Sequence, residues 1–167
     1  GGAHGMKTAV YAGSFDPVTY GHMDIVKRGS RLFEKIIIAV ISNPEKNPLL
    51  TLDQRMAILK EVIGTIPNVE IDSFDGLLVD YMKRKKTGIL LRGLRAVSDF
   101  DYEFQIAETN QKMFADMETV FMMTSSEYSY LSSSLVKQII RLGGPIDKFV
   151  PASVQKMLQD VLSKTTR

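Results

Sequence analysis

Five short apolar runs recur along this chain, and segments with helical spacing lie between them. The runs are rich in β-branched residues and cover residues 8–12, 36–41, 69–73, 88–91 and 118–123. Strands that alternate with helices in this way are typical of a parallel sheet covered by helices. The pattern therefore predicts an α/β fold with a five-stranded parallel sheet.

The first two intervening segments carry apolar residues at the spacing of an amphipathic helix. The first predicted helix is marked by Met23, Ile25, Val26, Leu32 and Phe33, and the second by Met56, Ile58, Leu59, Val62 and Ile63. Thr51 followed by Gln54 predicts a capping box at the start of the second helix.

Four more helices follow the same logic. The third is marked by Leu77, Leu78, Tyr81 and Met82, with Asp75 as its predicted cap and the basic run 83–86 at its C-terminal end. A helix dipole favours cations there, so we interpret this run as a solvated helix end rather than a nucleic-acid patch. The fourth covers residues 99–115, and two more begin near Ser132 and Pro151, with a break at 143–145 between them.

The length suits one domain with a full core of its own. The chain has 167 residues, and residues 1–5, which precede Met6, are typical of an expression-tag remnant. We assign residues 6–167 to a single domain of Rossmann-like, doubly wound α/β type with flanking helices.

Charge and cysteine content exclude several function classes. The 21 Lys and Arg against 19 Asp and Glu give a net charge of +2, too small a field to attract nucleic acid or an anionic membrane. The absence of cysteine excludes disulfides and thiolate chemistry. The longest apolar run, 36–41, is far below the roughly 20 residues of a membrane helix. With no secretory signal in view, we expect a cytoplasmic protein.

The loops that follow the predicted strands hold the candidate chemistry. In open parallel sheets, ligands bind beyond the carboxyl ends of strands, where the direction of strand addition reverses. Four such loops carry unusual residues: 13–22, 43–48, 92–95 and 124–134.

The loop 13–22 reads Gly-Ser-Phe-Asp-Pro-Val-Thr-Tyr-Gly-His. A strand, this loop and a helix opening at Gly21 and His22 would aim backbone N–H groups and an imidazole at one point, where an anion is favoured. Gly21 leaves room for a phosphate to approach the backbone. A plain turn with a surface histidine is the alternative, but the residue order is more specific than such a turn requires. The only other histidine, His4, lies in the tag segment.

Arg92 and Arg95 come directly after the fourth run. Their guanidinium forks suit phosphate oxygens. Ion pairs are an equally good interpretation of both, and the carboxylates available for them are Asp99, Asp101 and Glu103. Lys46 lies in a loop bounded by two prolines, where a lysine on its own is most often solvated.

The stretch 125–134 offers hydroxyls and free amides at a predicted helix start, a second cradle for an anion. Ordinary capping needs one serine, which does not account for the run Ser132, Ser133 and Ser134. Glu103 would meet a ribose or an adenine, or it would pair with a nearby arginine; the sequence leaves both open.

Together these motifs resemble the nucleotidyltransferase superfamily marked by an H/T-x-G-H element, and within it the bacterial phosphopantetheine adenylyltransferase family. The resemblance covers nearly all of residues 6–163 and rests on stretches 13–22, 91–96, 102–103 and 131–137, in the family's order and spacing. Related cytidylyltransferases end in an Arg-Thr-x-Gly-Ile-Ser-Thr signature that residues 128–134 do not follow, which favours ATP over CTP. Ser14 replaces the threonine of many members and keeps the hydroxyl.

The resemblance implies transfer of AMP from ATP to 4′-phosphopantetheine, giving dephospho-coenzyme A and pyrophosphate, the penultimate step of coenzyme A biosynthesis. It implies that His22 contacts the α-phosphate and that Lys46 lies near both reacting phosphates. Phosphopantetheine would be bound by Ser14, Lys46, Leu78 and Arg92. The implied ATP-binding residues are Ser14, Phe15, His22, Gly93, Leu94, Arg95, Glu103, Tyr128, Ser129, Tyr130, Leu131, Ser132, Ser133 and Ser134.

The attacking group of that reaction is already a phosphate anion, so positioning and charge stabilisation suffice without a nucleophilic side chain. We expect Mg²⁺ on the nucleotide phosphates, because the loops contain no cluster of carboxylates. The family also implies a homohexamer and feedback by coenzyme A, with neither nucleic acid nor membrane as partner. Two alternatives stay open: a related nucleotidyltransferase with another phosphorylated acceptor, and an ATP-binding regulatory module without turnover.

Overall fold

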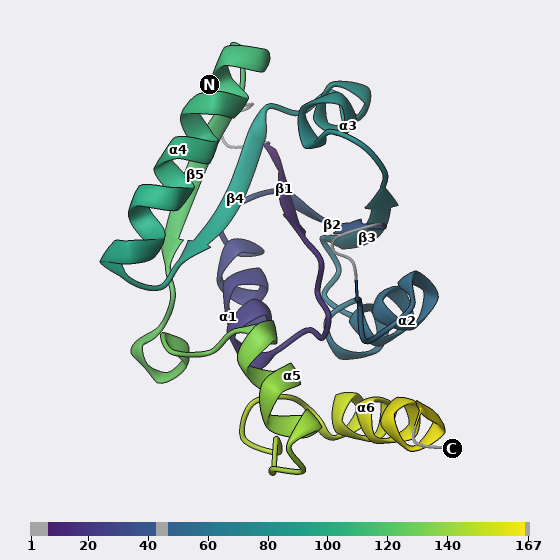
Figure 1. Ribbon diagram of the computed structural model, residues 1–167. Helices are drawn as coiled ribbons and strands as arrows, with labels where there is room; N and C mark the ends of the chain where they lie inside the picture. Colours follow the sequence, from purple (N-terminus) through teal and green to yellow (C-terminus); the bar gives the residue numbers. More distant parts are fainter. Residues whose placement is uncertain (1–6, 43–46, 166–167) are drawn as a thin grey trace.

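The computed structural model describes residues 7–42 and 47–165. One sheet of five parallel strands has the order β3-β2-β1-β4-β5 (Figure 1). The strands are β1 (Thr8–Gly13), β2 (Lys35–Ile41), β3 (Val69–Phe74), β4 (Ile89–Leu94) and β5 (Glu118–Met123). The predicted five-stranded parallel sheet is confirmed.

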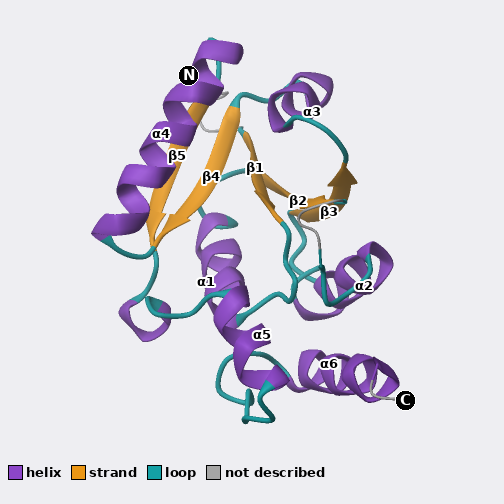
Figure 2. Cartoon of the chain, viewed as in Figure 1, coloured by secondary structure: helices purple, strands orange, loops and turns teal. Residues whose placement is uncertain are grey.

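Six helices alternate with and follow these strands in the described part of the chain (Figure 2). They are α1 (Tyr20–Gly29), α2 (Leu52–Val62), α3 (Leu78–Lys85), α4 (Val97–Met113), α5 (Ser133–Arg141) and α6 (Ala152–Thr165), with a 3₁₀ turn η1 at Ser126–Tyr128 before α5. The predicted capping box of Thr51 and Gln54 is present, and Ser132 caps α5 by accepting a hydrogen bond from the Leu135 N–H, 3.1 Å.

The central strands are buried on both faces because helices cover both sides of the sheet. Ala9 and Tyr11 of β1 belong to a core with apolar residues of α1, α2, α5 and α6. Val10 and Ala12 point the other way, into a core with α3. The period of two along a strand divides one apolar run between the two cores.

Three helices differ from the prediction at their ends, and one of them, α4, covers Val97–Met113 and not 99–115. The first helix ends at Gly29, where the N–H groups of Leu32 and Phe33 both donate to the Gly29 carbonyl in a closing turn. Leu32 is therefore outside the helix and 67% exposed. Asp75 does not cap α3, because Gly76 at φ 83° turns the chain between them and the Asp75 carboxylate accepts from the Gly76 N–H instead.

Candidate functional site

A cavity of about 480 Å³ lies at the carboxyl edge of the sheet, between the ends of β1 and β4. The chain adds β2 on one side of β1 and later returns to place β4 on the other side. This reversal leaves a crevice at the strand ends, which is where ligands bind in such folds. In Figure 1, β1 and β4 run toward α5 at this end of the molecule.

The cavity brings together most of the residues that the sequence singled out. Those that line it are Ser14, Phe15, His22, Arg92, Gly93, Arg95, Glu103, Leu131, Ser132, Ser133 and Ser134. Those placed outside its lining are Leu78, Leu94, Tyr128, Ser129 and Tyr130. Lys46 lies outside the described residues.

Several lining residues were assigned no site role from the sequence. They are Tyr11, Ala12, Ile25, Tyr102 and Thr124, together with Asp99, which was named only as an ion-pair partner. Thr124 directly follows β5, within the loop 124–134 that the sequence marked as a candidate, but it was given no role of its own. Tyr11 and Ile25 carry apolar patterns that mark core residues equally well.

The first turn of α1 fixes the His22 ring. Thr19 is the N-cap, and its hydroxyl accepts from the N–H groups of Gly21 and His22, at 3.2 and 3.4 Å. The Thr19 N–H in turn donates to Nδ1 of His22, 3.0 Å. A nitrogen that accepts this bond carries no proton, so the neutral ring holds its proton on Nε2.

Electrostatics keep that ring neutral. Burial and, after it, the positive charges of Arg92 and Arg95 together lower the pKa of His22 to about 4. At neutral pH the side chain is therefore an uncharged N–H donor at the cavity wall.

Phe15 and Asp16 fix the loop that follows β1. Phe15 has a left-handed backbone, φ 49°, and its buried ring meets the His22 ring edge-on, with centroids 5.1 Å apart. The Asp16 carboxylate accepts from the N–H groups of Leu49 and Leu50, both 2.8 Å. Lys137 of α5 pairs with the same carboxylate at 3.2 Å. The residues that read as a simple turn are thus anchored to two other segments.

The sequence predicted that Arg92 lies in a loop after the fourth strand. In the structure it lies within β4. β5 continues the ladder beside it, with Arg92 opposite Phe121 and Leu94 opposite Met123, so the strand extends to Leu94. The Arg92 guanidinium forms a two-pronged ion pair with Glu103 of α4, at 3.0 and 2.7 Å.

The predicted ion pairs and the predicted anion site involve the same arginines. Arg92 also donates to the Ala12 carbonyl, 2.8 Å, and among the described residues these bonds occupy three of its five N–H donors. Arg95 pairs with Asp99, 2.8 Å, and donates to the Leu131 carbonyl, 3.3 Å. Both side chains line the cavity, so the ion pairs orient them there.

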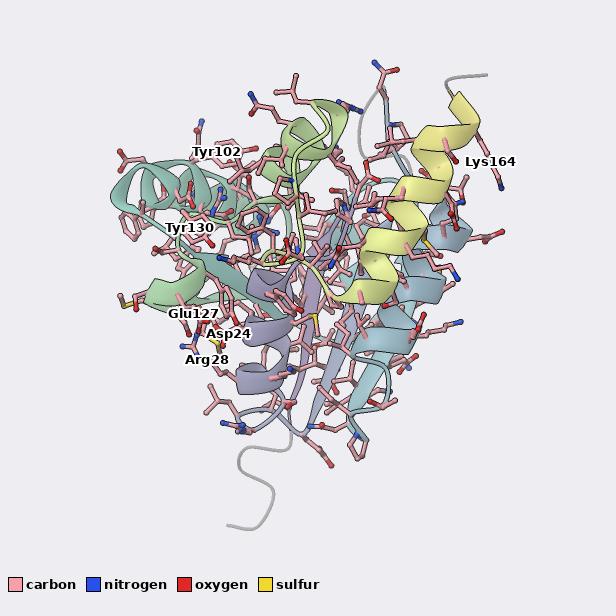
Figure 3. The ribbon with its side chains drawn as sticks, turned by 90° about the horizontal axis from the view of Figure 1, so that it is seen from below. Asp24, Arg28, Tyr102, Glu127, Tyr130 and Lys164 are labelled. Carbon is pink, nitrogen blue, oxygen red and sulfur yellow. The ribbon has the colours of Figure 1, made fainter. Side chains whose placement is uncertain are left out.

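The loop after β5 is tied to α1. The Asp24 carboxylate accepts from the Ser125 hydroxyl, 2.8 Å, and from Arg28, 3.0 Å. Burial raises the pKa of Asp24, but these hydrogen bonds outweigh it and hold the pKa below its usual value. Figure 3 shows Asp24 and Arg28 on the same side of the molecule as Glu127 of η1. The hydrogen bond between Asp24 and Ser125 fixes the position of the chain just before the serine run.

Comparison with known proteins now identifies the family. Residues 10–139 match the family model described as cytidylyltransferase-like. The phosphopantetheine adenylyltransferase of Caldanaerobacter subterraneus subsp. tengcongensis is 54% identical over 160 residues, which cover 96% of this chain and 100% of that protein. The chain belongs to the phosphopantetheine adenylyltransferase family. The member from Geotalea daltonii is 56% identical over 153 residues, covering 92% of this chain and 95% of the relative.

Solved structures agree on the fold of this family. Nicotinic acid mononucleotide adenylyltransferase of Plasmodium falciparum, complexed with NaAD, superposes with a TM-score of 0.68 at 16% identity, covering 96% of each chain. A putative nicotinate-nucleotide adenylyltransferase from Vibrio parahaemolyticus gives 0.66 at 16% identity, covering 93% of each chain. At this identity the likeness shows the Rossmann-like α/β fold alone.

Two features of the described residues bear on partners. Residues 7–42 and 47–165 contain no group of three or more His, Cys, Asp or Glu side chains arranged to hold a metal ion. Among the helices in these ranges, none has the length and apolar character needed to cross a membrane.

Proposed function

We propose that this member of the family transfers AMP from ATP to 4′-phosphopantetheine, forming dephospho-coenzyme A and pyrophosphate in coenzyme A biosynthesis. The observation that carries the proposal is the convergence of a neutral imidazole donor, two arginines and two helix starts on one cavity at the β1–β4 crevice. High identity to relatives named phosphopantetheine adenylyltransferase supports the choice of phosphopantetheine as acceptor.

The reaction is an in-line displacement. An oxygen of the phosphopantetheine phosphate forms a bond to the α-phosphorus of ATP, the bond from that phosphorus to its bridging oxygen breaks, and pyrophosphate leaves with the electron pair. Negative charge spreads over the α-phosphate oxygens meanwhile. Preorganised donors that face this charge lower the barrier without a covalent step.

The chain's own residues would divide between the two substrates. His22 would donate from Nε2 to the α-phosphate, and Ser14 and Arg92 would hold the acceptor phosphate. Lys46 is proposed to contact both reacting phosphates, and Leu78 the pantetheine arm through its backbone. The proposed ATP-binding residues are Ser14, Phe15, His22, Gly93, Leu94, Arg95, Glu103, Tyr128, Ser129, Tyr130, Leu131, Ser132, Ser133 and Ser134.

Mg²⁺ is proposed to enter with the nucleotide. Both carboxylates that line the cavity, Asp99 and Glu103, are already paired with arginines. The donor set therefore fits a metal carried on phosphate oxygens and not one held in a protein cage. When bound, it would neutralise phosphate charge.

We also propose a cytoplasmic homo-oligomer, a hexamer by family resemblance, with feedback by coenzyme A. An apolar surface supports association: Phe100 and Phe104 of α4 are exposed, and Phe100 lies 6.3 Å from the Phe121 ring of β5. Met123 at the end of β5 is 76% exposed. We call these four residues the α4–β5 apolar face; surfaces of this kind mark interfaces.

The deciding experiment measures pyrophosphate release with ATP, Mg²⁺ and phosphopantetheine, against a reaction without acceptor. We expect pyrophosphate release only with all three. In His22→Ala the rate of release should fall by about 10²- to 10³-fold, the usual cost of removing one charge-stabilising donor. Release with a different phosphorylated acceptor, or with CTP in preference to ATP, would replace the substrate assignment. ATP binding by calorimetry without release for any acceptor would indicate a regulatory module.

A further inference from the structure

Arg55 of α2 is a buried arginine, and four of its five N–H donors bond backbone carbonyls. It is 1% exposed. Its Nη1 donates to the carbonyls of Ser14, 3.0 Å, and Ile41, 2.8 Å, while Nη2 donates to Ser42, 3.2 Å, and Nε to Leu50, 3.3 Å. A single guanidinium thus joins the ends of β1 and β2 to the start of α2.

The position of these carbonyls explains why a cation is needed there. Where a parallel strand ends, its last carbonyls lose their ladder partners, and a buried carbonyl without a donor is costly. Their partial negative charge would also oppose phosphates arriving at the same edge. Arg55 satisfies three such carbonyls, of Ser14, Ile41 and Ser42, together with the Leu50 carbonyl before α2, with one positive charge. Burial lowers the pKa of Arg55 and Asp16 opposes that shift, so the guanidinium stays protonated.

Asp16 completes the arrangement from the other end of the turn. It is 2% exposed, and its carboxylate accepts from the N–H of Leu50, whose carbonyl accepts from Arg55. The turn 14–16 is therefore held at both ends. Arg55 bonds the Ser14 carbonyl, the Asp16 carboxylate bonds the Leu50 N–H, and Arg55 also bonds the Leu50 carbonyl. Phe15, between the two anchored residues, carries the ring that packs against His22.

We propose that Arg55 is a positioning residue for adenylyl transfer, which sets the place of the turn 14–16 and, through Phe15, of the His22 ring. The proposal rests on the proposed function for its catalytic readout. Arg55 does not line the cavity, so it acts through the backbone of Ser14 and not by contact with substrate.

The test compares Arg55→Lys with Ile58→Val. Lysine keeps the charge but loses the planar fork that reaches several carbonyls. Ile58 lies on the same helix and is equally buried, and it forms none of the hydrogen bonds that hold the turn, so its shortening loosens the core beneath α2 while those bonds remain. Both variants are checked by circular dichroism and thermal unfolding, and assayed at a temperature at which both are folded.

We expect Arg55→Lys to lower kcat/KM for phosphopantetheine by roughly 10- to 100-fold, since small displacements of a reacting group cost that much. Ile58→Val should stay within about twofold of the parent protein. A second readout needs no turnover: in amide NMR spectra of the ligand-free protein, Ser14 and Phe15 signals should shift or broaden in Arg55→Lys but not in Ile58→Val.

Equal effects of the two variants on kcat/KM and on the amide signals would overturn the proposal and leave Arg55 a stability residue. If Arg55→Lys does not fold, Asp16→Asn, which removes the charge at the other end of the turn, must reproduce the amide shifts and the loss of kcat/KM. Unchanged values there would equally refute it. If the parent protein releases no pyrophosphate, the proposed function fails, and the amide signals alone decide whether Arg55 holds the turn.

Discussion

At the scale of single residues, His22 is a neutral hydrogen-bond donor. The sequence placed an imidazole at a helix start but did not show its protonation state. That state follows from the Thr19 N–H, which occupies Nδ1, and from burial beside two arginines. An uncharged N–H suits a role in which it meets developing negative charge without first binding a proton.

The first prediction concerns the titration of His22. Its NMR signals should titrate with a midpoint near pH 4, well below the ordinary value of 6.5. Because the unfolded chain binds this proton at the ordinary pKa, the contribution to stability is complete above pH 6.5 and is lost as the pH falls toward 4. Urea unfolding between pH 7 and 4 measures that loss, and His22→Gln should remove the His22 share of it. A midpoint near 6.5 would contradict the neutral-donor role.

The second prediction separates two roles of Arg92. Arg92→Ala should raise the KM for phosphopantetheine about 10- to 100-fold, the cost of a charged hydrogen-bond pair. It should also lower the free energy of unfolding by about 2 kcal/mol, because Glu103 stays behind almost buried. The double variant Arg92→Ala/Glu103→Gln should recover most of the lost stability, while its KM for phosphopantetheine should stay as high as in Arg92→Ala. Recovery of both, measured by steady-state kinetics and urea unfolding, would make Arg92 purely structural.

Some residues of the site could be predicted from a sequence pattern, and others could not. His22 and the serine run open helices, and Arg92 lies near the carboxyl end of β4, so topology alone placed them at one edge. Arg55 and Asp16 gave no such signal, because an arginine inside an amphipathic helix reads as solvated and Asp-Pro reads as a turn. Their roles depend on carbonyls and amides of distant segments, which only the folded chain brings together.

At the scale of elements, α1 has a glycine near each end. Gly21 lines the cavity, and Gly29 packs against the core. A Cβ at Gly21 would meet Thr19 Oγ1 at 3.4 Å and Tyr128 Cβ at 3.7 Å, both ordinary contacts. A Cβ at Gly29 would lie 2.8 Å from Ile36 Cδ1, a clash in the core. Within the chain, an added methyl group is therefore crowded at Gly29 and not at Gly21.

The third prediction uses this contrast. Gly21→Ala should fold with unchanged or slightly higher stability, by up to about 1 kcal/mol from helix propensity. It should nevertheless weaken ATP binding at least tenfold by calorimetry, since the methyl group would occupy space at the helix start where the phosphate is proposed to bind. Gly29→Ala is the matched control on the same helix and should unfold more easily while binding ATP normally. Normal ATP binding by Gly21→Ala would remove the phosphate from this helix start.

Element boundaries were the part of the fold that the sequence predicted least well. All five strands and the helix caps at Thr51 and Ser132 followed from local pattern. β4 extends to Leu94 because β5 supplies a ladder beside it, and α1 stops at Gly29 because the chain must turn back to enter β2. The end of β4 is therefore set by a neighbour in space, whereas the end of α1 is set by a local turn that the apolar spacing did not reveal.

At the scale of the whole molecule, the cavity lies close to an exposed apolar surface. Glu103, which pairs with Arg92 in the cavity, lies on α4 between Phe100 and Phe104 in sequence. Tyr102, on the same helix and labelled in Figure 3, lines the cavity and is largely exposed. Covering the α4–β5 apolar face would therefore restrain the helix that carries half of the Arg92–Glu103 pair.

The last prediction tests that face. β5 is an edge strand, and an exposed edge beside apolar side chains favours pairing with another chain. Met123→Lys, with or without Phe104→Lys, should shift the protein from oligomer to monomer in size-exclusion chromatography with light scattering. Leu142→Lys is the control, because Leu142 is 82% exposed at the end of α5, away from the face, and should leave the oligomer intact. If charge at Met123 leaves the mass unchanged while charge at Leu142 lowers it, the interface lies at α5. If the parent protein is itself monomeric, the face does not mediate association, and the restraint on α4 comes from within the chain.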